Sequence, residues 1–531
     1  MKTFERICRA MARPEFYPHP VSQLERRETH ISVVFLTGEF VYKLKKPVDF
    51  GFLDYTDLQT RKRLCELEVA LNRRLSGGVY LGVAAVCAKG DTFLLGEDGE
   101  EVEYAVVMRQ LADEASFSNR IASSRVERGD VASLGGFLAE FYRTAERGKE
   151  IDRFGESDII GCNTEENFRQ LAPFVGELLD SERFDFVMEA SRGFLRDCGA
   201  LFLRRVEEGK ICDGHGDLRA EHVYFLDRIQ VIDCVEFSER LRCGDIAADL
   251  AFLHMDVERL GRADLSLALL QGYTESSRDF SLYTLLDFYA CYRAVVKTKV
   301  ACLSASEGGE PLRRLEMGRR AARYLDLAFR FAVRFARPTL FILCGLPGSG
   351  KSSWAKKLAD IFALSLFGSD AVRKELPEYG EHSGPVALGT GIYRPEIRGR
   401  AYARLLAAAQ GELKGGRSVI LDATFSRRKW REEAVRLAGD LDATLLFCEC
   451  VSSEKTLLAR LCLREGKQGQ SDARPEHLHG LSQEFESLDE LPAEQRIRID
   501  TEGSPEASLP SVLLDIYSKK RVQVEQILER L

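Results

Sequence analysis

Residues 345–352 read Gly-Leu-Pro-Gly-Ser-Gly-Lys-Ser. The apolar run 339–344 before them has the length of a buried parallel strand, and residues 353–359 after them begin a helix. A strand, a glycine-rich loop ending in Lys-Ser and a helix form the context of a P-loop, which a chance glycine turn would lack. The sequence therefore predicts a loop whose backbone N–H groups bind a phosphate chain at a helix N-terminus.

The positions of this loop have distinct expected tasks. Lys351 would reach the β- and γ-phosphates of ATP, and the Ser352 hydroxyl would bind Mg²⁺. The predicted nucleotide-binding set is Gly345, Gly348, Ser349, Gly350, Lys351, Ser352 and Ser353.

The composition is that of a globular protein with about two to four domains in 531 residues. A formal net charge of −8 argues against a nucleic-acid coat protein or a basic membrane binder. The 14 cysteines are scattered without a Cys-x-x-Cys pair, and we expect reduced thiols in a cytoplasmic protein without a signal peptide. No run approaches about 18 apolar residues, so no membrane partner is expected.

Two β-rich runs within residues 29–48 flank the turn at 37–39, which predicts a hairpin. Lys43 and Lys45 share one face of the second run. A lysine on an inward face is costly to bury without an anion, although an edge strand with solvated lysines would show the same pattern.

A helix is predicted over residues 58–75, where leucines recur at helical spacing. Glu66 and Glu68 lie within it, and either could pair with the strand lysine. Glu68 has the better spacing relative to the leucines, so we expect it to be the partner.

Residues 213–223 read Asp-Gly-His-Gly-Asp-Leu-Arg-Ala-Glu-His-Val, and a strand follows at 229–233. Asp217 lies in the loop and Asp233 ends the strand. A loop carboxylate that orients a hydroxyl and a second carboxylate on Mg²⁺ are what phosphoryl transfer requires. Two aspartates that merely cap strand ends are the alternative.

Residues 29 to about 255 resemble the aminoglycoside phosphotransferase family of the protein-kinase-like superfamily. The resemblance lies in the HGDL frame around Asp217, the IDCVEF segment at Asp233 and the GDIAADLAFL segment at 244–253. It implies a two-lobed kinase fold with Asp217 as catalytic base and Asp233 as Mg²⁺ ligand. It also implies that Lys43 with Glu68 holds the α- and β-phosphates, and that Asp245 or Asp249 braces the catalytic loop.

Two positions depart from that family. His222 stands where the family has an asparagine metal ligand, and neutral imidazole is a poorer ligand for Mg²⁺ than an amide oxygen. We keep His222 as a candidate metal ligand of an altered site. The usual glycine-rich loop is also missing, since the turn at Thr37-Gly38 is short.

Three further positions in the P-loop domain are candidates, two of them for the acceptor and one for the metal. Asp370 follows a second predicted strand and could orient an acceptor hydroxyl, with Arg373 one helical turn later to hold the acceptor. An N-cap role for Ser369 or Asp370 is the alternative. Asp422 ends a third buried strand, in a Walker-B-like position near the metal.

Further arginines follow these positions. Arg460 and Arg464 precede a loop and suit a lid that closes over phosphates. The basic run 427–431 could bind an acceptor phosphate or form a solvated face. Residues 338 to about 515 resemble the P-loop kinase group that includes polynucleotide 5′-kinases, zeta toxins and gluconate kinases.

The predicted fold class is therefore α+β followed by α/β. Residues 1–336 form a two-lobed protein-kinase-like domain, with a small lobe at about 20–110 and a large lobe at about 111–336, and residues 337–531 form a doubly wound parallel-sheet P-loop domain. The predicted activity is ATP-dependent phosphorylation of a hydroxyl at the P-loop site, with a second phosphotransferase upstream. The acceptor stays open between a nucleic-acid 5′-end, a nucleotide, a sugar, another small molecule and a protein. In a second hypothesis, the upstream domain binds ATP without turnover and controls the P-loop domain.

Overall fold

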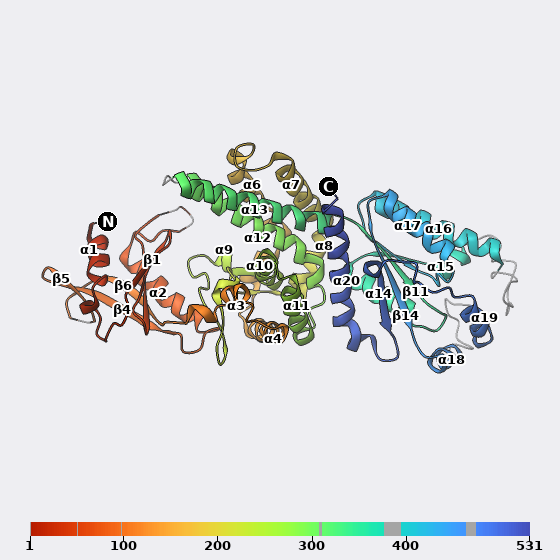
Figure 1. Ribbon diagram of the computed structural model, residues 1–531, viewed down its shortest axis with the longest axis horizontal. Helices are drawn as coiled ribbons and strands as arrows, with labels where there is room; N and C mark the ends of the chain where they lie inside the picture. The colour runs from red at the N-terminus through yellow and green to blue at the C-terminus, as the bar shows by residue number, and fades with distance from the viewer. Residues whose placement is uncertain are drawn as a thin grey trace. The chain divides into compact units, whose positions relative to one another are not determined.

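The computed structural model describes residues 2–49, 51, 53–96, 98–306, 311–375, 394–463 and 474–530 (Figure 1). The chain forms two compact units, which are described separately. The upstream unit comprises Met1–Asn163 and Phe202–Ser277, and the downstream unit comprises Thr164–Leu201 and Arg278–Leu531.

The upstream unit contains a six-stranded antiparallel sheet in the order β1-β2-β3-β6-β4-β5. Its strands are β1 (Glu25–Glu28), β2 (Ser32–Leu36), β3 (Phe40–Lys45), β4 (Tyr80–Lys89), β5 (Thr92–Leu95) and β6 (Glu100–Arg109). The predicted hairpin is confirmed, because β2 pairs with β3 across the turn. Since β3 lies between β2 and β6, its lysines are not those of an edge strand.

Helix α2 packs against β4 and β6 of this sheet, with Glu68 on its buried side and Glu66 exposed. Two short antiparallel strand pairs carry the loops of the large lobe. They are formed by β7 (Ile211–Asp213) with β10 (Cys243–Asp245) and by β8 (Val223–Phe225) with β9 (Ile229–Val231). The helices of this unit are α1 (Lys2–Met11), α2 (Leu58–Asn72), α3 (Phe117–Ala122), α4 (Arg128–Thr144), α5 (Lys149–Asp152), α9 (Glu239–Arg242), α10 (Ile246–Arg259) and α11 (Ala263–Ser277). Helices α6 (Ser157–Leu171) and α8 (Gly199–Glu207) belong partly to each unit.

The downstream unit contains a five-stranded parallel sheet in the order β12-β13-β11-β14-β15. Its strands are β11 (Thr339–Cys344), β12 (Ser365–Gly368), β13 (Val419–Asp422), β14 (Thr444–Val451) and β15 (Arg496–Asp500). Because β11 is central and the chain crosses to both sides of it, the carboxyl ends of β11 and β13 meet at one edge. The predicted doubly wound architecture is confirmed.

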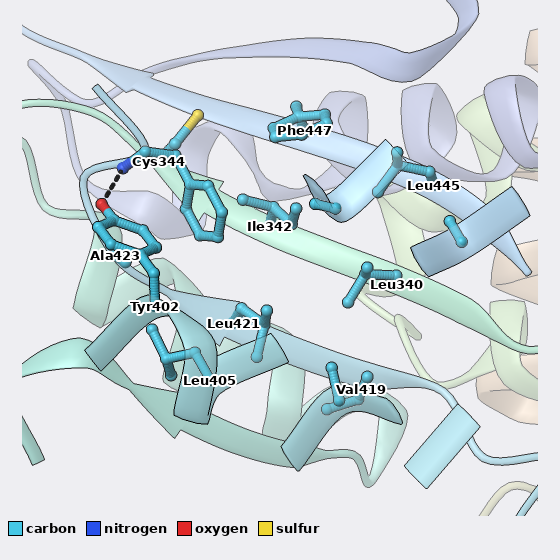
Figure 2. Close-up of a cluster of buried hydrophobic side chains, with 14 of the residues drawn as sticks. Leu340, Ile342, Cys344, Tyr402, Leu405, Val419, Leu421, Ala423, Leu445 and Phe447 are labelled. Atoms are coloured by element: carbon cyan, nitrogen blue, oxygen red, sulfur yellow. Dashed lines mark hydrogen bonds between the residues drawn. The ribbon is translucent and has the colours of Figure 1, made fainter. Parts of the chain in front are cut away.

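Helices cover both faces of this sheet. On one face, Leu340 and Ile342 of β11 pack with Leu405 of α16 in the buried cluster of Figure 2. On the other face, the Phe341 ring stacks 5.8 Å from Phe362 of α14. Because β11 lies in a sheet with helices on both faces, every residue of this strand is buried.

Long helices upstream of the P-loop domain belong to the downstream unit as well. Tyr517 of α20 donates a 2.6 Å hydrogen bond to Asp287 of α12, and Arg334 of α13 donates a 2.7 Å hydrogen bond to Glu525 of α20. The downstream unit therefore includes residues upstream of position 336. The predicted domain boundary near residue 336 stays a prediction. Its helices are α7 (Ser181–Asp197), α12 (Leu282–Ser306), α13 (Pro311–Ala336), α14 (Lys351–Phe362), α15 (Ser369–Lys374), α16 (Pro395–Lys414), α17 (Arg428–Asp440), α18 (Glu454–Cys462), α19 (Leu478–Gln483) and α20 (Pro505–Leu528).

Within the part of the chain that the structure describes, none of the helices combines the length and the apolar character that crossing a membrane requires.

Candidate active sites

The loop after β7 is braced from α10. The Asp249 carboxylate accepts hydrogen bonds from the backbone N–H groups of His215 at 2.6 Å and Gly216 at 2.9 Å. Asp245 instead pairs with the buried Arg205 and caps α10. Of the two aspartates that the resemblance left open, Asp249 is thus the one that braces the loop.

Asp217 is partnered by an arginine that the sequence did not single out. The Arg219 guanidinium donates to the Asp217 carboxylate through Nε, at 3.0 and 3.1 Å, and through Nη2, at 2.8 Å. Nη2 also lies 3.0 Å from His222 Nε2, and His222 Nδ1 lies 2.8 Å from the Asp217 backbone oxygen. Since a carbonyl oxygen only accepts, Nδ1 carries the proton and Nε2 accepts from Arg219.

Burial and the nearby charge of Arg219 lower the pKa of His222 to about 4, so its imidazole is neutral at pH 7. Its Nε2 lies 3.6 Å from Asp233 Oδ2. A nitrogen lone pair next to a carboxylate suits a borderline metal such as Mn²⁺ better than Mg²⁺. In the described residues, no group of three or more His, Cys, Asp or Glu side chains forms a ready metal site.

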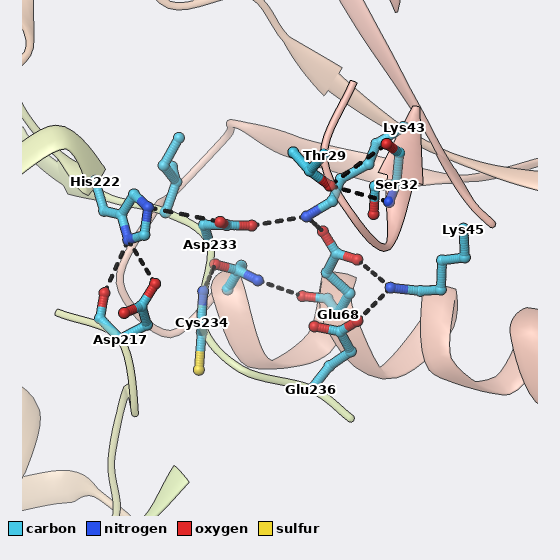
Figure 3. A network of polar contacts seen from close by, with 12 residues as sticks. Thr29, Ser32, Lys43, Lys45, Glu68, Asp217, His222, Asp233, Cys234 and Glu236 are labelled. Carbon is cyan, nitrogen blue, oxygen red and sulfur yellow. Dashed lines mark hydrogen bonds and ion pairs between the residues drawn. The ribbon is translucent and has the colours of Figure 1, made fainter. Parts of the chain in front are cut away.

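Lys43 joins strand β3, helix α2 and the segment that carries Asp233 (Figure 3). Its Nζ lies 2.9 Å from Glu68 Oε1 and donates a 2.7 Å hydrogen bond to Asp233 Oδ1. Burial acts to lower the pKa of Lys43, but the charges of Asp233 and Glu68 raise it well above its ordinary value, so the ammonium group stays charged. The structure therefore brings together the lysine and the two carboxylates that sequence reasoning selected.

Asp233 itself sits in a constrained turn. Its backbone has φ 65°, in the left-handed region, and its N–H donates to the Tyr80 hydroxyl at 3.2 Å. Burial acts to raise the pKa of the Asp233 carboxyl, but the charge of Lys43 and its hydrogen bond hold that pKa well below its ordinary value. An ionised carboxylate, 45% exposed, therefore faces the site.

Sequence reasoning missed Lys45 and Glu236 as parts of this cluster. Lys45 donates to Glu68 Oε2 at 2.6 Å and also contacts Glu236. One signal was present, since Lys45 shares the inward face of β3 with Lys43. Glu236, in the segment after Asp233, carried no such signal, because no regular strand or helix relates it to β3.

The P-loop joins β11 to α14, and Lys351 is the first residue of that helix. Gly348 and Gly350 have φ of 80° and 84°, which glycine adopts at little cost. At Gly345, a Cβ would lie 2.4 Å from the backbone oxygen of Cys450, so a side chain would collide with β14. The loop thus has the glycines that its backbone path requires.

Asp422 ends β13 opposite Leu343 of β11, and the Gly345 N–H donates to Thr424 just beyond it at 3.3 Å. Asp422 Oδ1 is buried and has no hydrogen-bond partner among the residues that the structure describes. A buried carboxylate oxygen without a partner is costly, and a hard cation satisfies it. These residues therefore fit Mg²⁺ held by Ser352 and Asp422.

Asp370 and Arg373 form an ion pair with each other on the short helix α15. The N-cap residue of α15 is Gly368, and no side chain caps the helix, so the alternative role for Ser369 or Asp370 is not the observed one. Asp370 and Arg373 both lie within α15, which ends before the undescribed segment 376–393.

Arg460 lies against the P-loop. It donates to the backbone oxygens of Gly348 at 3.3 Å and Thr501 at 2.5 Å. Arg464, its expected companion, lies outside the described residues. Within the basic run, Arg431 is fully buried and donates to the backbone oxygens of Phe425 and Ser487, so it stabilises the fold.

Comparison with known proteins gives a family match for each half of the chain. Residues 56–286 match the "Phosphotransferase enzyme family", and residues 340–488 match the "AAA domain". The chain is 33% identical over 496 residues to the "Uncharacterized protein Rv2004c" of Mycobacterium tuberculosis, which covers 92% of this chain and 95% of that protein.

Solved structures are similar to each half. A choline/ethanolamine kinase family protein from Mesorhizobium loti is 14% identical, with a TM-score of 0.36, over 62% of this chain and 99% of that one. A gluconokinase from Sinorhizobium meliloti is 18% identical, with a TM-score of 0.27, over 37% of this chain and 98% of that one.

Proposed function

Because this chain belongs to the same family as that mycobacterial protein and joins a phosphotransferase domain to a P-loop domain, we propose that it is an ATP-dependent kinase with two nucleotide sites. In this proposal the P-loop domain transfers the γ-phosphoryl group of ATP to a hydroxyl acceptor. The upstream domain is a second phosphotransferase.

The observation that carries the proposal for the P-loop site is the buried Oδ1 of Asp422 beside the loop, which has no hydrogen-bond partner within the described ranges. Ser352 and Asp422 would hold Mg²⁺, which when bound neutralises charge on the phosphates. The N–H groups of Gly345, Ser349 and Ser353 donate to backbone oxygens of the protein. In the proposal the other N–H groups of the loop bind the phosphate chain, and Lys351 reaches the β- and γ-phosphates.

Asp370 and Arg373 act on the acceptor side. Asp370 accepts the proton of the acceptor hydroxyl. The oxygen of that hydroxyl forms a bond to the γ-phosphorus, and the bond between the γ-phosphorus and ADP breaks. Arg373, which pairs with Asp370, holds the acceptor, and Arg460 with Arg464 closes over the phosphates. The acceptor is a nucleic-acid 5′-end, a nucleotide, a sugar or another small molecule.

The upstream site has a similar division of labour. Lys43, held by Glu68, contacts the α- and β-phosphates, Asp233 binds Mg²⁺, and Asp217 is the catalytic base. His222 is a second metal ligand once Arg219 withdraws from its Nε2. Each of these carboxylates is already ion-paired, which is how a charged site stays stable before ATP binds.

One observation favours a second function for the upstream domain. Because three hydrogen bonds from Arg219 occupy the Asp217 carboxylate, that carboxylate is a weak base until the arginine moves. If Arg219 stays on the Asp217 carboxylate, the upstream domain would bind ATP without turnover and would act as a regulator of the P-loop domain.

Transfer of labelled γ-phosphate by the full chain to sugars, nucleosides, RNA 5′-ends and proteins tests the proposal. Three proteins are compared: the wild type, Lys351→Ala and Asp217→Asn. We expect Lys351→Ala to remove transfer to one acceptor class and Asp217→Asn to remove transfer to another. If Asp217→Asn changes no transfer but alters the ATP dependence of the P-loop site, the regulator is the correct function. If no acceptor is labelled and ATP is not bound, the kinase proposal is wrong.

A further inference from the structure

Glu68 makes two ion pairs, and only one of them belongs to the expected lysine–glutamate pair. Its Oε1 lies 2.9 Å from Lys43 Nζ, and its Oε2 accepts a 2.6 Å hydrogen bond from Lys45 Nζ. Glu68 is fully buried and the Lys45 side chain is 1% exposed. Lys43 and Lys45 point the same way because alternate residues of a strand share a face.

Lys45 has a second carboxylate partner, Glu236, in the segment that follows Asp233. The Tyr55 hydroxyl donates a 2.6 Å hydrogen bond to Glu236 Oε1, and Lys45 Nζ lies 5.2 Å from the centroid of the Tyr55 ring. Glu236 therefore has two donors in the core. The three side chains of Lys45, Glu236 and Tyr55 form what we call the rear cluster.

Asn72, one helical turn after Glu68, links helix α2 to the segment that carries Asp233 and Glu236. Asn72 Nδ2 donates to the Glu68 backbone oxygen at 2.9 Å, and Asn72 Oδ1 accepts from the Cys234 N–H at 2.9 Å. The rear cluster and Asn72 thus connect α2 to the segment that carries Asp233. A displacement of that segment would break buried polar contacts, which are costly to leave unmade.

The charges explain what the rear cluster does for Lys43. Glu68, Asp233 and Glu236 supply three negative charges, and Lys43 and Lys45 supply two positive charges. Without Lys45, the buried Glu68 would be left with Lys43 as its only cation and would hold it more tightly. With Lys45 in place, Lys43 is shared between Glu68 and Asp233 and faces the solvent-exposed side of the site.

We propose that Lys45, Glu236 and Tyr55 are positioning residues of the upstream nucleotide site, which hold Glu68 and the Asp233 turn so that Lys43 is available to the phosphates of ATP. This inference rests on the proposed function of that site. It assigns the rear cluster a role in nucleotide affinity, and not only in stability.

The matched control is a second buried ion pair, which joins helix α2 to strand β6. Arg61 Nε donates to Glu103 at 2.9 and 3.1 Å, both side chains are buried, and neither contacts Lys43 or Asp233. Glu103→Gln should therefore destabilise the lobe as Glu236→Gln does, without moving the phosphate-binding groups.

The experiment measures binding of a fluorescent ATP analogue with Mg²⁺ to the full chain carrying Lys351→Ala and Asp422→Asn. These changes remove the lysine and the proposed metal ligand of the P-loop site, so that the upstream site is observed. Added changes are Glu236→Gln, Tyr55→Phe, Glu103→Gln and Lys43→Ala, and the melting temperature of each protein is recorded. We expect the Kd to rise about tenfold in Glu236→Gln and about threefold in Tyr55→Phe, and to stay unchanged in Glu103→Gln. Lys43→Ala should abolish binding.

Each outcome decides between the two levels of inference. If Lys43→Ala binds the nucleotide like its parent, the proposed upstream site itself is wrong. If Lys43→Ala fails to bind but Glu236→Gln and Tyr55→Phe keep the parental Kd, the rear cluster is only structural and the inference is overturned. Should Glu236→Gln not fold, Tyr55→Phe decides, because it removes a single hydroxyl.

Discussion

The two candidate sites differ in how their carboxylates are partnered. Upstream, Asp217 is paired with Arg219 and Asp233 with Lys43. At the P-loop, one buried oxygen of Asp422 has no hydrogen-bond partner in the described part of the chain. The upstream carboxylates are already paired with basic side chains, so the phosphates of a nucleotide would have to exchange with existing ion pairs. A cation bound beside that oxygen would stabilise the protein as well as the phosphates.

The largest expected effect is at the P-loop site. In a full chain silenced upstream by Asp217→Asn, we expect Lys351→Ala to lower ATP turnover about 100- to 1000-fold, because it removes a charge that acts on the transferring phosphoryl group. Lys356→Ala, at an exposed position of the same helix, is the control. Near-normal turnover in Lys351→Ala would remove the P-loop assignment.

The two downstream carboxylates should fail in different ways. Asp422→Asn should weaken Mg²⁺-dependent ATP binding about 10- to 100-fold, because a metal ligand is lost. Asp370→Asn should lower transfer by a similar factor and leave the ATP affinity unchanged, because it acts on the acceptor. Titrations of ATP and Mg²⁺ check this, with the exposed Asp440→Asn as control. Identical defects would mean that the roles are assigned wrongly.

The upstream loop should lose stability in acid. Burial lowers the pKa of both His215 and His222, the latter to about 4. A histidine in the unfolded chain has a pKa of about 6.5, so between about pH 6.5 and pH 4 the unfolded state binds more protons than the folded state. The stability contributed by the neutral histidines is therefore fully present above about pH 6.5 and is lost as the pH falls below that value. For His222 the loss at pH 5 is on the order of 2 kcal/mol. Hydrogen exchange of peptides from 211–235 measures it.

In that experiment His222→Asn should flatten the pH dependence of exchange in the upstream loop, whereas peptides from β11 serve as an internal control in the same samples. An equal acid response in wild type and variant would show that His222 does not have the lowered pKa.

The metal preference of the upstream site is a smaller effect. His222→Asn replaces a nitrogen by an amide oxygen next to Asp233, so we expect Mg²⁺-supported turnover to rise about tenfold and the preference for Mn²⁺ to fall. Turnover is measured with each metal in the Lys351→Ala background. Since the pKa of His222 is about 4, its imidazole stays neutral and the metal ratio should be flat from pH 5.5 to 8. No change in turnover or preference would make His222 a packing residue.

The smallest effect tests where the downstream unit ends. Tyr517→Phe removes the 2.6 Å hydrogen bond to Asp287 and should cost about 1 kcal/mol. Trp354 and Trp430 are the two tryptophans of the chain, and both lie in this unit, so their fluorescence reports its unfolding. Ser511→Ala, at an exposed position of α20, is the control. An unchanged tryptophan transition would mean that the P-loop domain is stable without α12.

Local patterns predicted the elements and most of the candidate residues. Residues 345–352 predicted strand, loop and helix because all three parts are contiguous, and the structure has them as β11, the P-loop and α14. The pairing of Lys43 with Glu68 could be predicted because strand alternation and helical spacing each select one side chain. Their functional roles stay predictions.

The side-chain partners within and between irregular segments could not be predicted. Arg219 on Asp217, the choice of Asp249 over Asp245, and Glu236 on Lys45 all join residues that no periodic element relates. Irregular segments have no fixed spacing that places a side chain, so these contacts depend on how the whole unit packs.

By itself, the sequence determined the two architectures, their order along the chain and the P-loop. It also selected Lys43, Glu68 and Asp233 upstream, and Asp422 at the end of β13. Only the tertiary structure decided which of these groups are already neutralised and which are not. The reason is physical. The type and period of a side chain follow from the local chain, whereas charge pairing depends on distances of a few ångströms, within an irregular loop for Asp217 and between distant segments for Asp233.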